Sequence, residues 1–283
     1  MRSHLADFDL VVAADLAEAL RLLAAGWRPI AGGTDLMVLF NAGRLAYRKL
    51  VGITKLPELT AITLSPNAIT LGAAVTYSAI QRHSLLESEF PLLCRAASWT
   101  GGAANQNRGT LGGNIVNASP AADSPPALLV YDAELELIST SGSRRIRYGE
   151  FHTGYKLMQS RPEELLVKIH LPRHQRELSQ YARKVGARKA QAISKVCFNA
   201  VAEVNSSFIK HIRIALGSVA PVPLRCRKVE EALSGQTLTS TLIAHARDLI
   251  AQEIQPIDDI RSTAKYRSLV TQNLLTEFLG SLL

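Results

Sequence analysis

Two short glycine segments carry the residue types best suited to chemistry in this chain of 283 residues. The first is Ile30-Ala31-Gly32-Gly33-Thr34-Asp35-Leu36, directly after a short apolar run that predicts a strand. Two consecutive glycines let the backbone adopt positive φ and bring its N–H groups to an anion without a Cβ in the way. The alternative is a tight strand exit with no ligand. The segment has neither the lysine of a Walker loop nor the third glycine of a Rossmann fingerprint.

The second segment, about eighty residues later, is Thr110-Leu111-Gly112-Gly113-Asn114, followed by Ser119 and Asp123. Again a threonine accompanies two glycines, and a carboxylate lies downstream. An acidic side chain beside a phosphate-binding loop can accept hydrogen bonds from ribose hydroxyls while the backbone holds the pyrophosphate. Two such loops could hold both ends of one molecule, so together they predict a dinucleotide site.

The elements that must position these loops are short and mixed in type. Apolar spacing predicts a helix over Leu16–Ala24 with Asp15 as its N-cap, then a strand over Trp27–Ala31. Residues 100–126 hold too many Gly, Asn and Pro for long regular elements. The polar segment Arg173–Ser179 marks the expected domain boundary, and strands backed by helices follow it. Strands that do not strictly alternate with helices point to an α+β fold.

Composition restricts the class of protein. With 47% hydrophobic and 20% charged residues and a formal charge of +8, the chain is a folded, basic protein with an expected acidic partner or anionic cofactor. Cys94, Cys197 and Cys226 are too scattered for a disulfide framework or a metal cluster. His152, His170 and His174 are the nearest histidines, and ordinary hydrogen-bonded side chains are favoured over metal ligands. We expect no signal peptide, no membrane span and a cytoplasmic location.

The residues of both loops resemble the FAD-binding subunit of the xanthine dehydrogenase, or molybdenum hydroxylase, family. The resemblance rests on AGGTDLM at 31–37, NRGTLGGNIVNASPAADSPPALLVYDAELEL at 107–137 and DIRSTAKYR at 259–267. It extends to FHTGYK at 151–156, the strand at 162–172, YARKVGARKAQAISKV at 181–196 and ALGSVAPVPLRC at 215–226. It therefore covers almost the whole chain.

This resemblance implies a two-domain flavoprotein of the α+β class. Residues 1–175 would form an FAD-binding domain of the vanillyl-alcohol oxidase (PCMH) type, made of two subdomains. Residues 176–283 would form a smaller α+β domain like that of carbon monoxide dehydrogenase flavoproteins, with a three-stranded sheet and a helical bundle.

The resemblance also implies which residues bind FAD, and it assigns no catalytic side chain and no metal ligand. Ala31 to Leu36 and Thr110 to Asn114 would wrap the pyrophosphate, and Asp123 would bind the adenosine ribose. Leu165 would pack near the flavin, and Lys184 would reach the cofactor from the second domain and stabilise negative charge on reduced flavin. The full candidate set is Pro29, Ile30, Ala31, Gly32, Gly33, Thr34, Asp35, Leu36, Thr100, Thr110, Leu111, Gly112, Gly113, Asn114, Ser119, Asp123, Leu165 and Lys184.

The implied activity is that of an oxidoreductase acting within a complex, with xanthine as one candidate substrate. A molybdopterin-binding large subunit would oxidise the substrate, a small subunit with [2Fe–2S] clusters would relay electrons, and FAD on this chain would pass them to NAD or another acceptor. The free subunit could also form a homodimer. Because the chain has only three cysteines, iron–sulfur clusters belong on a partner.

Three alternatives stay open at this level. A stand-alone flavin oxidase would need a larger substrate domain than the residues after 180 provide. An assembly subunit without FAD would not need the intact glycine pairs and Asp123. Nucleic-acid binding is suggested by the basic pairs Arg144-Arg145, Arg183-Lys184 and Arg188-Lys189, but these are dispersed and lack interleaved aromatics for stacking.

Overall fold

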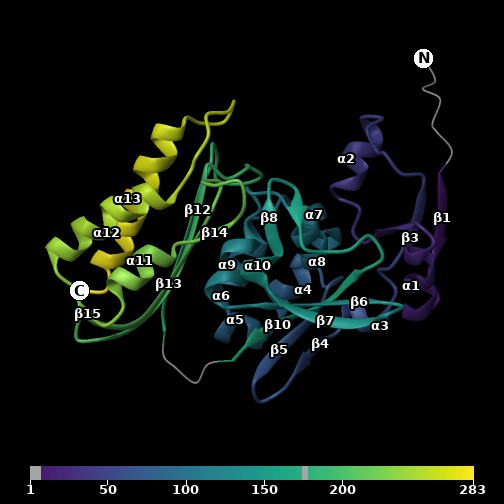
Figure 1. Ribbon diagram of the computed structural model, residues 1–283, viewed down its shortest axis with the longest axis horizontal. Helices are drawn as coiled ribbons and strands as arrows, with labels where there is room; N and C mark the ends of the chain where they lie inside the picture. The colour runs from purple at the N-terminus through teal and green to yellow at the C-terminus, as the bar shows by residue number, and fades with distance from the viewer. Residues whose placement is uncertain (1–7, 174–177) are drawn as a thin grey trace.

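The computed structural model describes residues 8–173 and 178–283, which form three parts in a row (Figure 1). The N-terminal part lies at one end, the segment from β4 to β10 forms the middle, and the C-terminal part from β11 onward lies at the other end. The predicted boundary between residues 175 and 176 lies outside the described residues. Within the described residues, no helix is long and apolar enough to cross a membrane.

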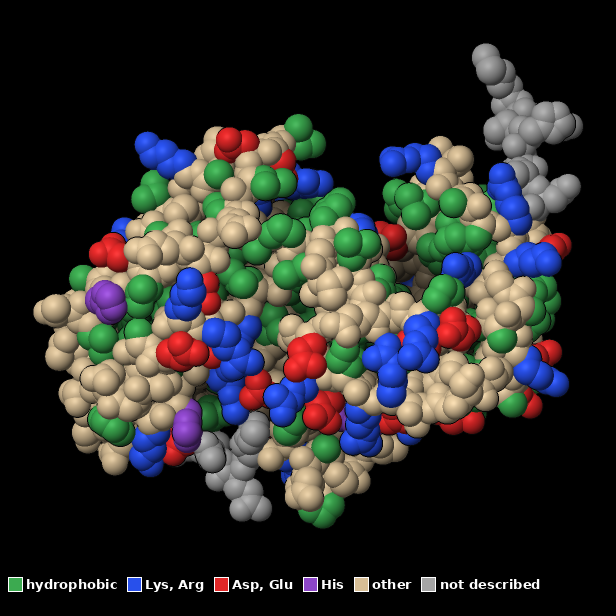
Figure 2. Space-filling view, viewed as in Figure 1, with side chains coloured by type: hydrophobic (Ala, Val, Ile, Leu, Met, Phe, Trp, Pro, Cys, Tyr) green, Lys and Arg blue, Asp and Glu red, His purple; other side chains and the backbone are tan. Residues whose placement is uncertain are grey.

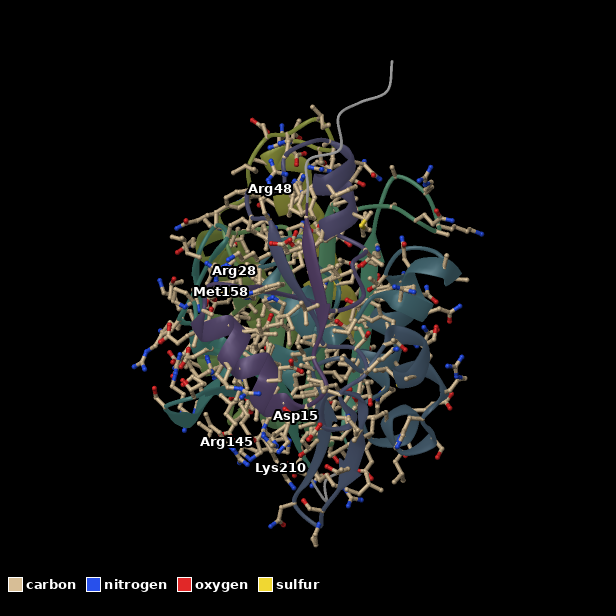
Figure 3. All side chains as sticks on the ribbon, turned by 90° about the vertical axis from the view of Figure 1, so that its right-hand side faces the viewer. Asp15, Arg28, Arg48, Arg145, Met158 and Lys210 are labelled. Atoms are coloured by element: carbon tan, nitrogen blue, oxygen red, sulfur yellow. The ribbon has the colours of Figure 1, made fainter. Side chains whose placement is uncertain are left out.

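The N-terminal part is a small parallel sheet covered by one helix, which Figure 3 shows from the side of α1 and β1. Its strands β1 (Asp9–Val12), β3 (Lys49–Gly52) and β2 (Arg28–Ile30) lie in the order β1-β3-β2. Helix α1 spans Leu16–Ala24 as predicted, and the Asp15 carboxylate caps it by accepting from Glu18 N at 2.7 Å. Two short helices, α2 (Leu36–Asn41) and α3 (Pro57–Thr60), follow β2 and β3.

The middle part is a five-stranded antiparallel sheet with short helices packed against it. The strand order is β4-β5-β10-β6-β7, so β10 is the central strand, and seven of its eight residues are apolar or buried on the two faces of the sheet. The elements are β4 (Ile62–Leu64), β5 (Ala68–Gly72), α4 (Tyr77–Arg82), α5 (Ser84–Glu89), α6 (Pro91–Trp99), β6 (Glu134–Ser139), β7 (Gly142–Arg147), α10 (Tyr148–Phe151), β8 (His152–Gly154), β9 (Leu157–Met158) and β10 (Leu165–Pro172).

Residues 100–126 contain only short helices, as their composition predicts. Helix α7 covers Ala103–Arg108 and α8 covers Leu111–Val116. Helix α9 begins within the segment and covers Ser124–Val130, with prolines in its first turn. The second glycine pair therefore lies in the first turn of a six-residue helix rather than in an open loop.

The C-terminal part has more strands than the predicted three. Three long strands, β11 (Ser179–Val185), β12 (Val196–Asn205) and β13 (Phe208–Gly217), form the body of the sheet. Two-residue strands β14 (Leu224–Arg225) and β15 (Gln236–Thr237) add to β13 and are too short to leave a sequence pattern. The helices are α11 (Arg227–Leu233), α12 (Ser240–Glu253) and α13 (Ala264–Gly280).

The two faces of this sheet contribute to two different hydrophobic cores. On one face Phe198, Ile212 and Ile214 pack in a core with α11, α12 and α13. On the other face Ala182, Val201 and Ala215 pack in the core of the middle part. Successive strand residues point to opposite faces, so apolar residues at successive positions let one sheet serve two cores. The C-terminal sheet is thereby fixed against the middle part.

The hydroxyl of Tyr131 joins the same two parts. This fully buried side chain accepts from Leu92 N at 3.0 Å and donates to Gln180 Oε1 at 2.6 Å. Leu92 lies in the first turn of α6, where backbone N–H groups have no partner within the helix. Its amide therefore depends on Tyr131.

We expect Tyr131→Phe to lower the free energy of unfolding by about 1–3 kcal/mol, because it leaves a buried N–H and a side-chain amide oxygen without a partner. Urea unfolding followed by circular dichroism measures the change. The control is Tyr155→Phe, whose side chain is 66% exposed and should change the free energy by less than about 0.5 kcal/mol. Equal stability of Tyr131→Phe and wild type would contradict the assignment.

Candidate FAD site

The first glycine segment leaves the C-terminal end of β2 and turns directly into α2. Gly33 has φ +72°, a conformation that favours glycine, and its carbonyl accepts from Met37 N at 2.9 Å. In the part of the chain that the structure describes, the N–H groups of Gly33, Thr34 and Asp35 donate to no protein acceptor. Three consecutive backbone donors are thus available to an anionic ligand.

The second glycine segment differs, because its N–H groups are already used. Thr110 caps α8 by accepting from Gly113 N at 3.1 Å. Leu111 N donates to Val75 O and Gly112 N donates to Ala73 O, at 3.0 and 2.8 Å. These bonds fasten the start of α8 to the chain leaving β5. The segment can therefore form a wall of a site, while the free backbone donors come from the first segment.

The first segment contacts the residues on both sides of the second segment. A Cβ on Gly32 would lie 1.9 Å from Arg108 O, so only glycine allows this approach. From the other side, Asn117 Nδ2 donates to Asp35 Oδ1 at 3.2 Å. A Cβ on Gly113 would meet only Thr110 Oγ1 within 4 Å, so the space beside Gly113 is otherwise open. In Figure 2 the surface is notched between α2 and the centre of the molecule.

A buried polar network connects Thr100 with the second segment. Ser124 Oγ donates to Asn114 Oδ1 at 2.6 Å. The Tyr77 hydroxyl is in hydrogen-bond contact with the side chains of Ser124 and Thr100, and burial raises the pKa of Tyr77 far above its ordinary value. Tyr77 is therefore a neutral hydroxyl that fixes its neighbours. Sequence reasoning missed Tyr77 and Ser124, although Ser124 directly follows the predicted Asp123.

Asp123 and Lys184, predicted at separate points on the cofactor, form one ion pair. Lys184 Nζ lies 2.6 Å from Asp123 Oδ2 and also donates to Trp99 O at 3.0 Å. Ser194 Oγ donates to Asp123 Oδ1 at 2.5 Å. Burial raises the pKa of Asp123, and Lys184 and Ser194 oppose that shift. Asp123 directly precedes Ser124, whose side chain bonds to Asn114, so the ion pair is connected to the second segment. The contacts of Asp123 and Lys184 with FAD remain predictions.

The remaining predicted residues lie around these loops. Pro29 and Ile30 pair with Val51 and Gly52 in the parallel sheet. Leu165, only 4% exposed, packs in the hydrophobic core of the N-terminal part. Ser119 Oγ accepts from Ala121 N at 3.3 Å, between α8 and α9. Their contacts with the cofactor also remain predictions.

The histidines have ordinary partners. His170 Nε2 contacts Glu136 Oε2 at 2.8 Å, and its Nδ1 contacts the Thr70 hydroxyl at 2.9 Å. His152 Nε2 donates to Ile115 O at 2.9 Å, and burial lowers the pKa of His152. His174 lies outside the described residues. Across residues 8–173 and 178–283 no group of His, Cys, Asp and Glu could hold a metal ion.

Most charges of the three basic pairs have partners inside the protein. Arg144 forms two hydrogen bonds to the Glu164 carboxylate, at 2.7 and 2.8 Å. These contacts hold the guanidinium group within the protein. The others are Arg145 with Glu136, Arg183 with Glu277, Lys184 with Asp123, and Arg188 with the carbonyls of Ala190 and Gln191.

Two family descriptions match this chain. The FAD-binding domain of molybdopterin dehydrogenases matches residues 6–174, and the carbon monoxide dehydrogenase flavoprotein C-terminal domain matches residues 181–282. The first match alone covers more than half of the chain. The chain belongs to this flavoprotein family. The resemblance drawn from the glycine segments is thereby confirmed.

Relatives and solved structures agree with the assignment. The xanthine dehydrogenase FAD-binding subunit of Escherichia coli O157:H7 is 32% identical over 93% of this chain and 91% of that subunit. The glyceraldehyde dehydrogenase medium chain of Sulfolobus acidocaldarius is 30% identical over 95% of each chain. Carbon monoxide dehydrogenase from Hydrogenophaga pseudoflava superposes with a TM-score of 0.92 at 26% identity, over 98% of this chain and 97% of that one. The predicted α+β fold is confirmed.

In this flavoprotein, Gly32→Ala should abolish stoichiometric FAD binding, because the added methyl group collides with the Arg108 backbone and forces the two segments apart. FAD content after reconstitution, with circular dichroism to monitor folding, tests this. Gly280→Ala is the matched control, because a Cβ there meets nothing within 4 Å. A folded Gly32→Ala protein with full FAD content would contradict the predicted cradle.

We also expect Lys184→Met to cost about 3–5 kcal/mol of unfolding free energy near neutral pH, because it leaves the Asp123 carboxylate buried without a counter-charge. Burial then holds the pKa of Asp123 above its unfolded value. The loss should therefore be large at about pH 7 and shrink towards about pH 4, where the carboxyl group is neutral. Urea unfolding of the FAD-free protein measures it. The double variant with Asp123→Asn should recover part of the loss, and no recovery would contradict the pairing.

Proposed function

We propose that this chain is the FAD-binding electron-transfer subunit of a multi-subunit molybdenum hydroxylase similar to xanthine dehydrogenase. It takes electrons from the [2Fe–2S] clusters of a small partner subunit, and NAD is the proposed final acceptor. A molybdopterin-binding large subunit oxidises the organic substrate. The names of the relatives, an FAD-binding subunit and medium chains, support a place in such a complex.

The observation that carries the proposal is the meeting of the two glycine segments. Gly33, Thr34 and Asp35 offer free backbone donors, and the space beside Gly113 is open. Backbone donors suit a pyrophosphate, because they need no counter-charge and hold a fixed geometry. These residues therefore fit an FAD pyrophosphate.

Binding and orientation are the tasks of the protein residues. FAD, when bound, supplies the redox chemistry, accepting electrons singly and passing two on together. The Asp123–Lys184 pair, adjacent to Asn114 through Ser124, would place a charged group of the C-terminal part beside the cofactor. The three cysteines carry free thiols, which suits the proposed cytoplasmic location.

The purified chain, reconstituted with FAD, should retain one FAD and absorb near ~450 nm. NADH should bleach this absorbance if NAD is the acceptor, and bleaching by dithionite alone would reject NAD. Failure to bind FAD would overturn the proposed function. Oxidation of xanthine or an aldehyde by the isolated chain would instead show a self-sufficient oxidase, and would overturn the electron-transfer role.

A further inference from the structure

The hairpin β8–β9 packs against the C-terminal end of α8, the helix that carries the second glycine pair. His152, at the start of the hairpin, donates to Ile115 O. At its turn, Lys156 has φ +58°, a left-handed conformation uncommon for a residue with a side chain. Strained residues of this kind persist where the surrounding contacts fix them, and they cluster at functional sites.

The ammonium of Lys156 makes two short contacts with a single residue. Its Nζ donates to Asn117 O at 2.5 Å and to Asn117 Oδ1 at 2.7 Å. The contact with the backbone oxygen alone would be an ordinary helix cap by a basic side chain. The second contact fixes the orientation of the Asn117 amide, because an ammonium can only donate to the oxygen. The Nδ2 group must then point the other way.

Asn117 holds both glycine segments. Its backbone N–H donates to Gly113 O at 3.0 Å, and its Nδ2 donates to Asp35 Oδ1 at 3.2 Å. The three residues Lys156, Asn117 and Asp35 thus form a series of contacts from the hairpin turn to the first segment.

The side chain of Asp35 is not used to cap α2. Asp35 directly precedes this helix with a helical backbone (φ −92°, ψ −43°) rather than the extended one of a capping residue, and its side chain makes no cap hydrogen bond. Its carboxylate accepts from Asn117 Nδ2. A released Asp35 carboxylate could turn back onto the free N–H groups nearby, in competition with a phosphate.

We propose that Lys156 is a positioning residue for the cofactor. Through Asn117 it holds the Asp35 carboxylate away from the backbone donors of the first glycine segment. It also fixes the position of the first segment relative to the second. This role rests on the proposed function, because it assumes that those donors bind the FAD pyrophosphate.

The test is titration of the FAD-free chain with FAD, followed by flavin fluorescence. Lys156→Met and Asn117→Ala should each weaken FAD binding about fivefold, a modest loss because Lys156 is exposed to solvent. Lys156→Arg, which keeps the cation and the donors, should bind within about twofold of wild type. The double variant Lys156→Met/Asn117→Ala should bind like Asn117→Ala alone, because the residues act in series.

Lys228→Met is the matched control, since it removes an exposed lysine from α11 in the C-terminal part and should leave FAD affinity unchanged. Wild-type affinity in Lys156→Met would overturn the positioning role alone. Wild-type affinity in Asn117→Ala would also overturn the positioning role, because Lys156 would then act only as a cap for the end of α8. A wild-type chain that does not bind FAD would overturn the proposed function, and the positioning role with it.

Discussion

The candidate site depends on the approach of Gly32 to the carbonyl of Arg108. A side chain at position 32 would place a carbon 1.9 Å from that oxygen, so the N-terminal and middle parts can meet here only through bare backbone. A second contact also requires glycine: a Cβ on Gly112 would lie 2.6 Å from the Cβ of Ala73. The Gly32 contact brings together two segments about eighty residues apart, and the Gly112 contact fixes the second of them to the chain after β5. Beside Gly113 a Cβ would meet only Thr110 Oγ1, so the space there is otherwise open.

The two segments have similar sequences but differ in whether their backbone N–H groups already have acceptors. Thr110 uses its hydroxyl to cap α8, and Ala73 accepts from Gly112, so the second segment is rigid and internally satisfied. The first segment has no such acceptors for Gly33, Thr34 and Asp35. A backbone N–H that faces solvent costs little free energy, because water can accept from it. Once a ligand covers that N–H, the ligand must supply the acceptor, so an anionic group suits this position.

Local signals in the sequence predict much of the fold, and long-range contacts account for what they miss. Helix α1 and its Asp15 cap follow from residues within one turn. The hairpin turn between β12 and β13 has no such local signal, because Ser206 and Ser207 adopt positive φ there without glycine. The meeting of Asp123 with Lys184 could not be predicted from spacing, because it depends on how the C-terminal sheet packs.

Because of that pairing, residues of both domains contribute to the candidate site. Asp123 immediately precedes Ser124, which bonds to Asn114 in the second segment, while Lys184 comes from β11. Removing either partner leaves a buried charge, which costs far more than the intact pair contributes. A displacement of the C-terminal sheet would therefore reach Asn114 through two short contacts. Gly217 on the inner face of that sheet lies so close to α9 that a Cβ there would be 3.3 Å from Pro126 Cγ, and this close packing is thus a condition for the site as well as for the core.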